Sequence, residues 1–260
     1  MRYKAIMFDV DGTLIPYNYS ALPSDTVAEA IKKAQKYVTV SLVTGRSYGF
    51  LKEILKKLDL NTGYAVINNG AQVIELSKGT IVYDQPIEKQ DAEEIISFLQ
   101  QENIPFYLKQ NHHEYSCALQ TFQNGQTFEN AYMFFTDEIL SEDKANSVIN
   151  TLSHLSNITL YKSRHKHPNK YGINITHAKA TKLHGIYEVG KRINVSPQEM
   201  IGVGDSYNDF SLLMACGLKV AMGNAIADLK AIADYIAPSV TEDGAATVIE
   251  KFILSAPSQK

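Results

Sequence analysis

Two pairs of aspartates follow apolar segments of this chain, and their spacing is the first sign of chemistry. Asp9 and Asp11 come directly after the apolar run 5–8. Side chains at positions i and i+2 of an extended backbone lie on the same side of it. Two carboxylates so close repel each other unless a cation lies between them or one is protonated, and Mg²⁺ prefers such hard oxygen ligands. The alternative is a pair of solvated acids in a turn, because Asp-Gly is a turn signal.

The second pair consists of Asp205 and Asp209, which follow an apolar run ending at Gly204. Their i, i+4 spacing is one helical turn, so both side chains can face one site. Asp, Ser and Asn are also the preferred residues for capping the N-terminus of a helix. The segment therefore predicts a second cluster of acids, a helix start, or both at once for different residues.

Two further segments could bind an anion. Thr44-Gly45-Arg46 offers a hydroxyl and backbone N–H groups at a predicted helix start. A turn from strand to helix often contains Thr and Gly, however, and Arg46 can equally be a surface charge. Lys182 lies near the start of another predicted helix, where a lysine can bridge a carboxylate and a phosphate. A solvated lysine is the alternative, and Lys179 competes for the same role.

A pattern of short apolar runs alternating with amphipathic segments predicts the scaffold that positions these residues. The runs predict strands buried on both faces, as in parallel sheets, and apolar residues at helical spacing predict helices between them. The expected strands are 5–8, 38–43, 64–67, 200–203 and 218–222, and the expected helices are 25–37, 50–58, 183–193, 210–215, 225–231 and 245–253. Each chemical signal lies after a predicted strand or near a helix start, where open α/β sheets bind ligands. The pattern predicts an α/β fold, a Rossmann-like three-layer core with a parallel sheet.

The middle of the chain differs in amino-acid composition from the two ends, which predicts an inserted domain. From about residue 85 to residue 177 the sequence is more polar and aromatic, with helices expected near 91–101 and 142–154 between short strand-like runs. We therefore expect an inserted α+β domain, called the cap below, at 85–177 and a core made of 1–84 and 178–260. An insertion of roughly 90 residues is within the normal size of a domain.

Composition excludes several classes of function. The 260 residues carry a formal net charge of −3, which argues against the basic footprint of a nucleic-acid-binding protein. Two cysteines are too few for a disulfide framework and suggest a reducing compartment. No apolar run reaches the ~18–20 residues that span a bilayer, or the ~7–15 residues of a secretory signal near the N-terminus. We expect a cytoplasmic monomer without nucleic-acid or membrane partners.

The four segments together resemble the haloacid dehalogenase superfamily of phosphohydrolases, over the whole chain. Its first motif, Asp-x-Asp-Gly-Thr, corresponds to 9–13, and its second, Ser/Thr-Gly-Arg in many members, corresponds to 44–46. Its third motif is a lysine, matched best by Lys182, and its fourth, Gly-Asp-x-x-Asn-Asp, corresponds to 204–209. The Asn-Asp ending and the large insertion resemble the Cof-type branch (class IIB). The segment at 222–225 resembles the Met-Gly-Asn-Ala segment that follows the fourth motif in the family.

The resemblance implies a magnesium-dependent phosphatase of small phosphorylated metabolites, such as sugar phosphates, flavin mononucleotide or pyridoxal phosphate. Asp9 would attack phosphorus and form an aspartyl-phosphate. Asp11 would protonate the leaving oxygen and then activate water. The carboxylates of Asp9 and Asp205 and the backbone carbonyl of Asp11 would hold Mg²⁺, which keeps several waters and needs few protein ligands.

The resemblance also implies roles for the other motif residues and for the cap. The phosphoryl oxygens would be held by Thr44, Lys182 and Asn208, and Asp209 would orient Lys182 or the waters of the metal. The cap would close over the core and contact the rest of the substrate. Its candidate contacts are His112, His113, Tyr115, Tyr132 and His165.

Three alternatives to a phosphatase stay open at this point. A phosphosugar mutase of the same fold would return the phosphoryl group instead of releasing it. A phosphoacceptor signalling domain would keep it, although that class needs neither the second acid at Asp11 nor a large cap. A regulatory protein would bind the phosphorylated ligand without turnover.

Overall fold

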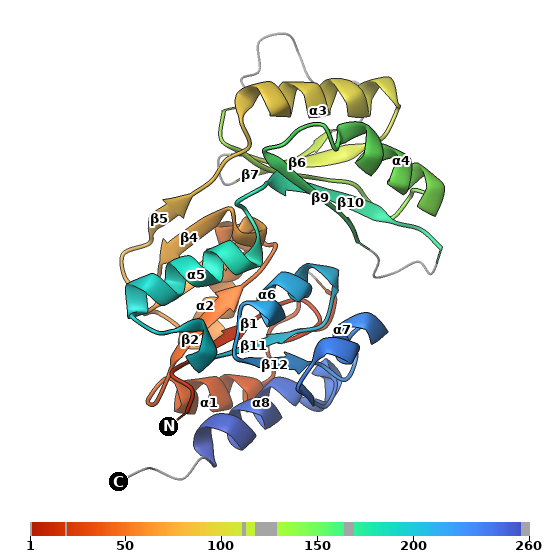
Figure 1. Cartoon of the computed structure of the whole chain (residues 1–260). Helices are drawn as coiled ribbons and strands as arrows, with labels where there is room; N and C mark the ends of the chain where they lie inside the picture. The colour runs from red at the N-terminus through yellow and green to blue at the C-terminus, as the bar shows by residue number, and fades with distance from the viewer. Residues whose placement is uncertain (1, 19, 111–112, 118–128, 164–168, 256–260) are drawn as a thin grey trace. The chain divides into compact units, whose positions relative to one another are not determined.

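The computed structural model describes residues 2–18, 20–110, 113–117, 129–163 and 169–255 (Figure 1). The chain forms two compact units. The first consists of Met1–Tyr83 and Lys182–Lys260, and the second of Asp84–Thr181. The expected fold class is confirmed, because a mainly parallel sheet with helices forms one unit and a separate antiparallel sheet forms the other.

The first unit is built on an eight-stranded sheet. Its strands are β1 (Ala5–Phe8), β2 (Thr39–Val43), β3 (Tyr64–Ile67), β4 (Gln72–Glu75), β5 (Thr80–Asp84), β11 (Met200–Gly204), β12 (Leu218–Ala221) and β13 (Tyr235–Ile236). They are arranged in the order β13-β12-β11-β1-β2-β3-β4-β5. All five predicted strands are present. The hairpin partners β4 and β5 were not predicted, and β4 runs antiparallel to β3.

The centre of this sheet is parallel and buried, as the apolar runs predicted. All four residues of β1 and all five of β11 are buried. Phe8 at the end of β1 pairs with Val203 of β11 on one side and with Leu42 of β2 on the other. The carboxyl ends of β11, β1 and β2 therefore lie side by side, and the loops that follow them share one edge.

Helices cover the sheet of the first unit. They are α1 (Asp25–Ala34), α2 (Lys52–Lys57), α5 (Lys182–Ile193), α6 (Phe210–Met214), α7 (Ala227–Ile232) and α8 (Gly244–Ile249). Helix α1 packs against α8, whereas α5 packs against α6 and strands β2 to β4 (Figure 1). Helix α1 begins at the cap Ser24, whose hydroxyl accepts a hydrogen bond from the Val27 N–H. The single helix predicted over 245–253 is instead α8 followed by a π-helical segment, Glu250–Leu254.

The second unit has a five-stranded sheet in the order β7-β6-β8-β10-β9, antiparallel at each pair. Its elements are α3 (Lys89–Gln101), β6 (Phe106–Gln110), β7 (His113–Cys117), β8 (Ala131–Phe135), α4 (Glu142–Leu152), β9 (Ile158–Ser163) and β10 (Gly172–His177). The two predicted helices are present, and their apolar faces share one core with Leu108, Phe134 and Ile175 of the sheet. In the described part of the chain, every helix is too short or too polar to cross a membrane.

Candidate active site

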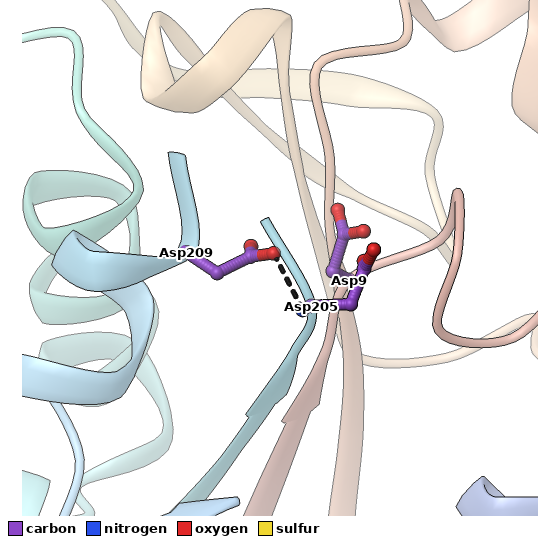
Figure 2. Close-up of side chains that lie close together, drawn as sticks. All are labelled: Asp9, Asp205 and Asp209. Atoms are coloured by element: carbon purple, nitrogen blue, oxygen red, sulfur yellow. Dashed lines mark hydrogen bonds between the residues drawn. The ribbon is translucent and has the colours of Figure 1, made fainter. Parts of the chain in front are cut away.

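Three loops at one edge of the parallel sheet bring the predicted acids together. Asp9 follows β1, Thr44 follows β2 and Asp205 follows β11, and these strands are neighbours. Carboxylate oxygens of Asp9, Asp205 and Asp209 all lie within 4.8 Å of one another. Figure 2 shows the side chains of Asp9 and Asp205 rising side by side from adjacent strand ends, with the carboxylate of Asp209 reaching toward the backbone of Asp205. The site therefore arises where the strand order of an α/β sheet favours ligand binding.

Lys182, at the first position of α5, lies between two of these acids. Its Nζ donates hydrogen bonds of 2.6 Å to Oδ1 of Asp9 and 2.6 Å to Oδ1 of Asp209. The lysine side chain is only 1% exposed. Burial alone would lower the pKa of Lys182, but the attraction of Asp209 and Asp9 outweighs it and raises this pKa. Lys179, the competing lysine, is exposed.

Burial and mutual repulsion make the ionised forms of Asp9 and Asp205 unfavourable unless a cation lies close to them. Burial raises the pKa of Asp9 well above its usual value, against the attraction of Lys182 and with the repulsion of Asp209 and Asp205. Burial and the charge of Asp209 raise the pKa of Asp205 to about 7. One lysine does not neutralise three buried carboxylates, and a divalent cation would remove the excess.

Hydrogen bonds give Asp209 a positioning role in the site. Both oxygens of Asp209 are engaged, because Oδ1 accepts from Lys182 and Oδ2 accepts from the N–H groups of Asp205 and Ser206. Asp209 thus holds its own loop as a helix cap, so both interpretations of this segment apply. Oδ2 of Asp9 accepts no hydrogen bond from a described residue. The carboxylates of Asp9, Asp205 and Asp209 together offer an all-oxygen donor set that fits a hard dication.

Asp205 is held by two hydroxyls, one of which the sequence analysis missed. Thr13 donates to Oδ1 at 3.2 Å and Tyr17 donates to Oδ2 at 2.5 Å. A side chain at Gly12 would overlap both Asp205 and Tyr17, and its φ of +84° also favours glycine. The Thr13 contact follows from the first motif. Tyr17 lies outside the first motif, and no sequence pattern around it indicates this contact.

Arg46 is a buried partner of Asp11, and the alternative of a surface charge is wrong. Its Nε donates to Oδ2 of Asp11 at 2.8 Å and a terminal nitrogen donates to Oδ1 at 2.6 Å. The Arg46 side chain is 3% exposed and that of Asp11 is 27% exposed. Such a bidentate pair fixes the plane of the carboxylate, which a lysine could not do. The second acid is thus oriented by the second motif.

Thr44 and Asn208 lie at the same edge and are connected through Asn69. Thr44 is buried, and its Oγ accepts the N–H of Arg46 at 3.1 Å. Asn208 donates from Nδ2 to Oδ1 of Asn69 at 3.1 Å. Asn69 follows β3 and lies outside the four segments singled out in the sequence. The structure therefore adds the end of a fourth strand to the site.

The candidate cap contacts are only partly covered by the structure. His112 and His165 lie outside the described residues. His113 and Tyr115 are exposed on β7, with their ring centres 6.1 Å apart. Tyr132 is buried and forms a hydrogen bond with Asp84.

Comparisons with known proteins agree with this geometry. A model of the haloacid dehalogenase-like hydrolase family matches residues 6–249. "Phosphatase YwpJ" of Bacillus subtilis is 26% identical, over 96% of this chain and 100% of that protein. "5-amino-6-(5-phospho-D-ribitylamino)uracil phosphatase YcsE" of the same species is 27% identical, over 96% of each chain. The solved structure of the HAD subclass IIB sugar phosphatase BT4131 superposes with a TM-score of 0.77 at 22% identity, covering 96% of this chain and 98% of its own.

These matches run through every segment of the site described above. The expected class of enzyme, a phosphatase of the Cof-type branch, is confirmed by the family match and by these relatives. With a parallel sheet, acids at its central strand ends and a separate antiparallel unit, the chain belongs to the haloacid dehalogenase-like hydrolase family.

Proposed function

We propose that this protein is a magnesium-dependent phosphatase of small phosphate monoesters, acting through an aspartyl-phosphate on Asp9. The observation that supports this most directly is the environment of the Asp9 carboxylate. Its Oδ1 is held by Lys182 at 2.6 Å, and no described residue donates a hydrogen bond to its Oδ2. A carboxylate fixed at one oxygen and available at the other is arranged as a nucleophile.

The other residues then have distinct tasks in the reaction. Asp9 attacks phosphorus, and the ester oxygen leaves with a proton from Asp11. Asp11 next takes a proton from the water that hydrolyses the aspartyl-phosphate, which releases inorganic phosphate and restores Asp9. Arg46 keeps the Asp11 carboxyl oriented for both steps. Lys182, Thr44 and Asn208 hold the phosphoryl oxygens.

Magnesium is the dication we propose for the carboxylates of Asp9 and Asp205 and the backbone carbonyl of Asp11. When bound, it neutralises charge on the transferring phosphoryl group. Support comes from the donor set, which consists of oxygens only, and from the raised pKa of Asp9 and Asp205. We assign Asp209 to orienting Lys182, which donates a hydrogen bond to its Oδ1.

The substrate class is proposed more broadly. One relative is named for a phosphorylated ribityl compound and a structural neighbour is named a sugar phosphatase, which favours polyol and sugar phosphates, with flavin mononucleotide and pyridoxal phosphate as further candidates. We propose that residues 85–177 act as the cap that selects among them and that 1–84 and 178–260 form the catalytic core. The net charge of −3 and two buried free cysteines favour a cytoplasmic monomer without nucleic-acid or membrane partners.

A phosphate-release panel tests the proposal. Sugar phosphates, flavin mononucleotide, pyridoxal phosphate and p-nitrophenyl phosphate are each assayed with magnesium and with a chelator, using the wild type and Asp9→Asn. We expect release that needs magnesium and is abolished in the variant, while its circular dichroism is unchanged. Wild-type activity in Asp9→Asn would refute the covalent mechanism. Isomer interconversion without phosphate release would identify a mutase instead, and tight binding without either would identify a regulatory protein.

A further inference from the structure

Two consecutive asparagines after β3 adopt a left-handed backbone conformation that residues other than glycine rarely adopt. Asn68 has a φ of +50° and Asn69 a φ of +56°, and both are buried. Left-handed conformations cost energy for residues other than glycine, although asparagine tolerates them best. Such residues persist where the surroundings enforce them, and they cluster at functional sites. The contacts around Asn68 and Asn69 must therefore enforce this conformation.

The backbone of this turn holds the loop that follows β2. The N–H of Asn69 donates to the carbonyl of Thr44 at 3.0 Å, and the N–H of Asn68 donates to the carbonyl of Arg46 at 3.0 Å. These two bonds bracket Gly45. A Cβ atom at Gly45 would lie 3.1 Å from Oδ1 of Asn69, so the amide of Asn69 packs directly over this glycine.

The side chains of the two asparagines point to different partners. Asn68 donates from Nδ2 to Oε1 of Gln72, within the turn. Asn69 instead accepts the hydrogen bond from Nδ2 of Asn208, 139 positions away in sequence, at 3.1 Å. Asn208 is half-buried, and Asn69 is 5% exposed. Asn68 therefore stabilises its own turn, whereas Asn69 contacts the fourth motif.

We propose that Asn69 is a positioning residue that aligns Asn208 and the Thr44–Arg46 loop into one phosphate-binding cradle. A side-chain amide is planar and has two N–H donors. When Oδ1 of Asn69 fixes one N–H of Asn208, the direction of the second is fixed too, and that donor is free to meet a phosphoryl oxygen. The inference rests on the proposed function, because it assigns Asn208 to the phosphoryl group.

The test compares Asn69→Gly with Asn68→Gly. Glycine accepts the left-handed conformation at both positions, so each variant should fold. Only Asn69→Gly removes the bond to Asn208. The affinity for inorganic phosphate with saturating magnesium is measured by calorimetry, and kcat and KM are measured on the best substrate of the panel. We expect Asn69→Gly to lower phosphate affinity and kcat/KM about 10- to 100-fold, as for displaced substrate-positioning groups, and Asn68→Gly to stay within about twofold of wild type.

A double-mutant cycle shows whether Asn69 acts through Asn208. In an Asn208→Ala background, Asn69→Gly should have no further effect on phosphate affinity, because the partner is already lost. Equal losses in the two glycine variants, or full additivity in the cycle, would overturn the inference and leave Asn69 as an ordinary turn residue. Wild-type protein that releases no phosphate from any substrate would refute the proposed function, and the phosphate affinities of the variants would then decide the inference on their own.

Discussion

Replacing Lys182 with methionine is the sharpest test of the electrostatic balance in the site. Methionine keeps most of the apolar stem and removes the ammonium group, with its charge and its N–H donors. Lys182 is 1% exposed, and its partners Asp9 and Asp209 have side chains that are 6% and 0% exposed. Removing one partner of a buried ion pair costs about 3–5 kcal/mol. We therefore expect Lys182→Met to lower the free energy of unfolding by about that amount at pH 8 without metal.

The expected loss depends on pH, with a definite sign. The charge of Lys182 opposes the rise in the pKa of Asp9, so this pKa rises further in the variant. As the pH falls below that pKa, the folded variant takes up a proton that the unfolded chain, with an Asp pKa of about 3.9, does not bind. Its stability then recovers by about 1.4 kcal/mol per pH unit for one proton. Wild type also gains stability as the pH falls, but less, because Lys182 keeps the pKa of its Asp9 lower than in the variant. The difference from wild type should therefore shrink between pH 8 and pH 5.

Urea denaturation at pH 8 and pH 5, with a chelator present, measures both effects. Lys179→Met is the matched control, because Lys179 is exposed and its loss should change stability by no more than about 0.5 kcal/mol. Phosphate release should vanish in Lys182→Met and persist in Lys179→Met. A Lys182→Met protein within 1 kcal/mol of wild type at pH 8 would contradict the reasoning, as would a loss independent of pH. About 1 kcal/mol is the ordinary effect of a substitution.

Three further outcomes are expected. Arg46→Met should lower kcat at least about tenfold in phosphate release and leave magnesium affinity unchanged, because Asp11 loses its orientation; equal turnover would contradict this. Tyr17→Phe should raise the Kd for magnesium about tenfold in calorimetry, since a group that orients a metal ligand is lost; tighter binding would mean that the hydroxyl competes with the metal. Metal-free wild type should gain stability as the pH falls from 8 to 5, because the folded state protonates Asp205 near pH 7 and the unfolded state does not; added magnesium should reverse this trend in urea denaturation.

The fold and the acids could be predicted because their signals are local. The apolar run of β1 followed by Asp9 and Asp11 marks both a buried strand and the chemistry at its end. The same holds for β11 and Asp205. Strands β4 and β5 were missed, because each carries only a short apolar stretch, 73–74 in β4 and 81–83 in β5, between polar residues.

The sequence by itself determined the central strands β1, β2, β3, β11 and β12, the acids at their ends and the family to which they point. Residues a few positions apart carry that information. Only the tertiary structure decided which side chains meet. It chose Lys182 over Lys179, turned Arg46 inward to Asp11, and joined Asn69 to Asn208 across 139 positions. No periodicity spans such separations. These contacts exist because neighbouring parallel strands end at one edge, and the strand order becomes known only when the chain is folded.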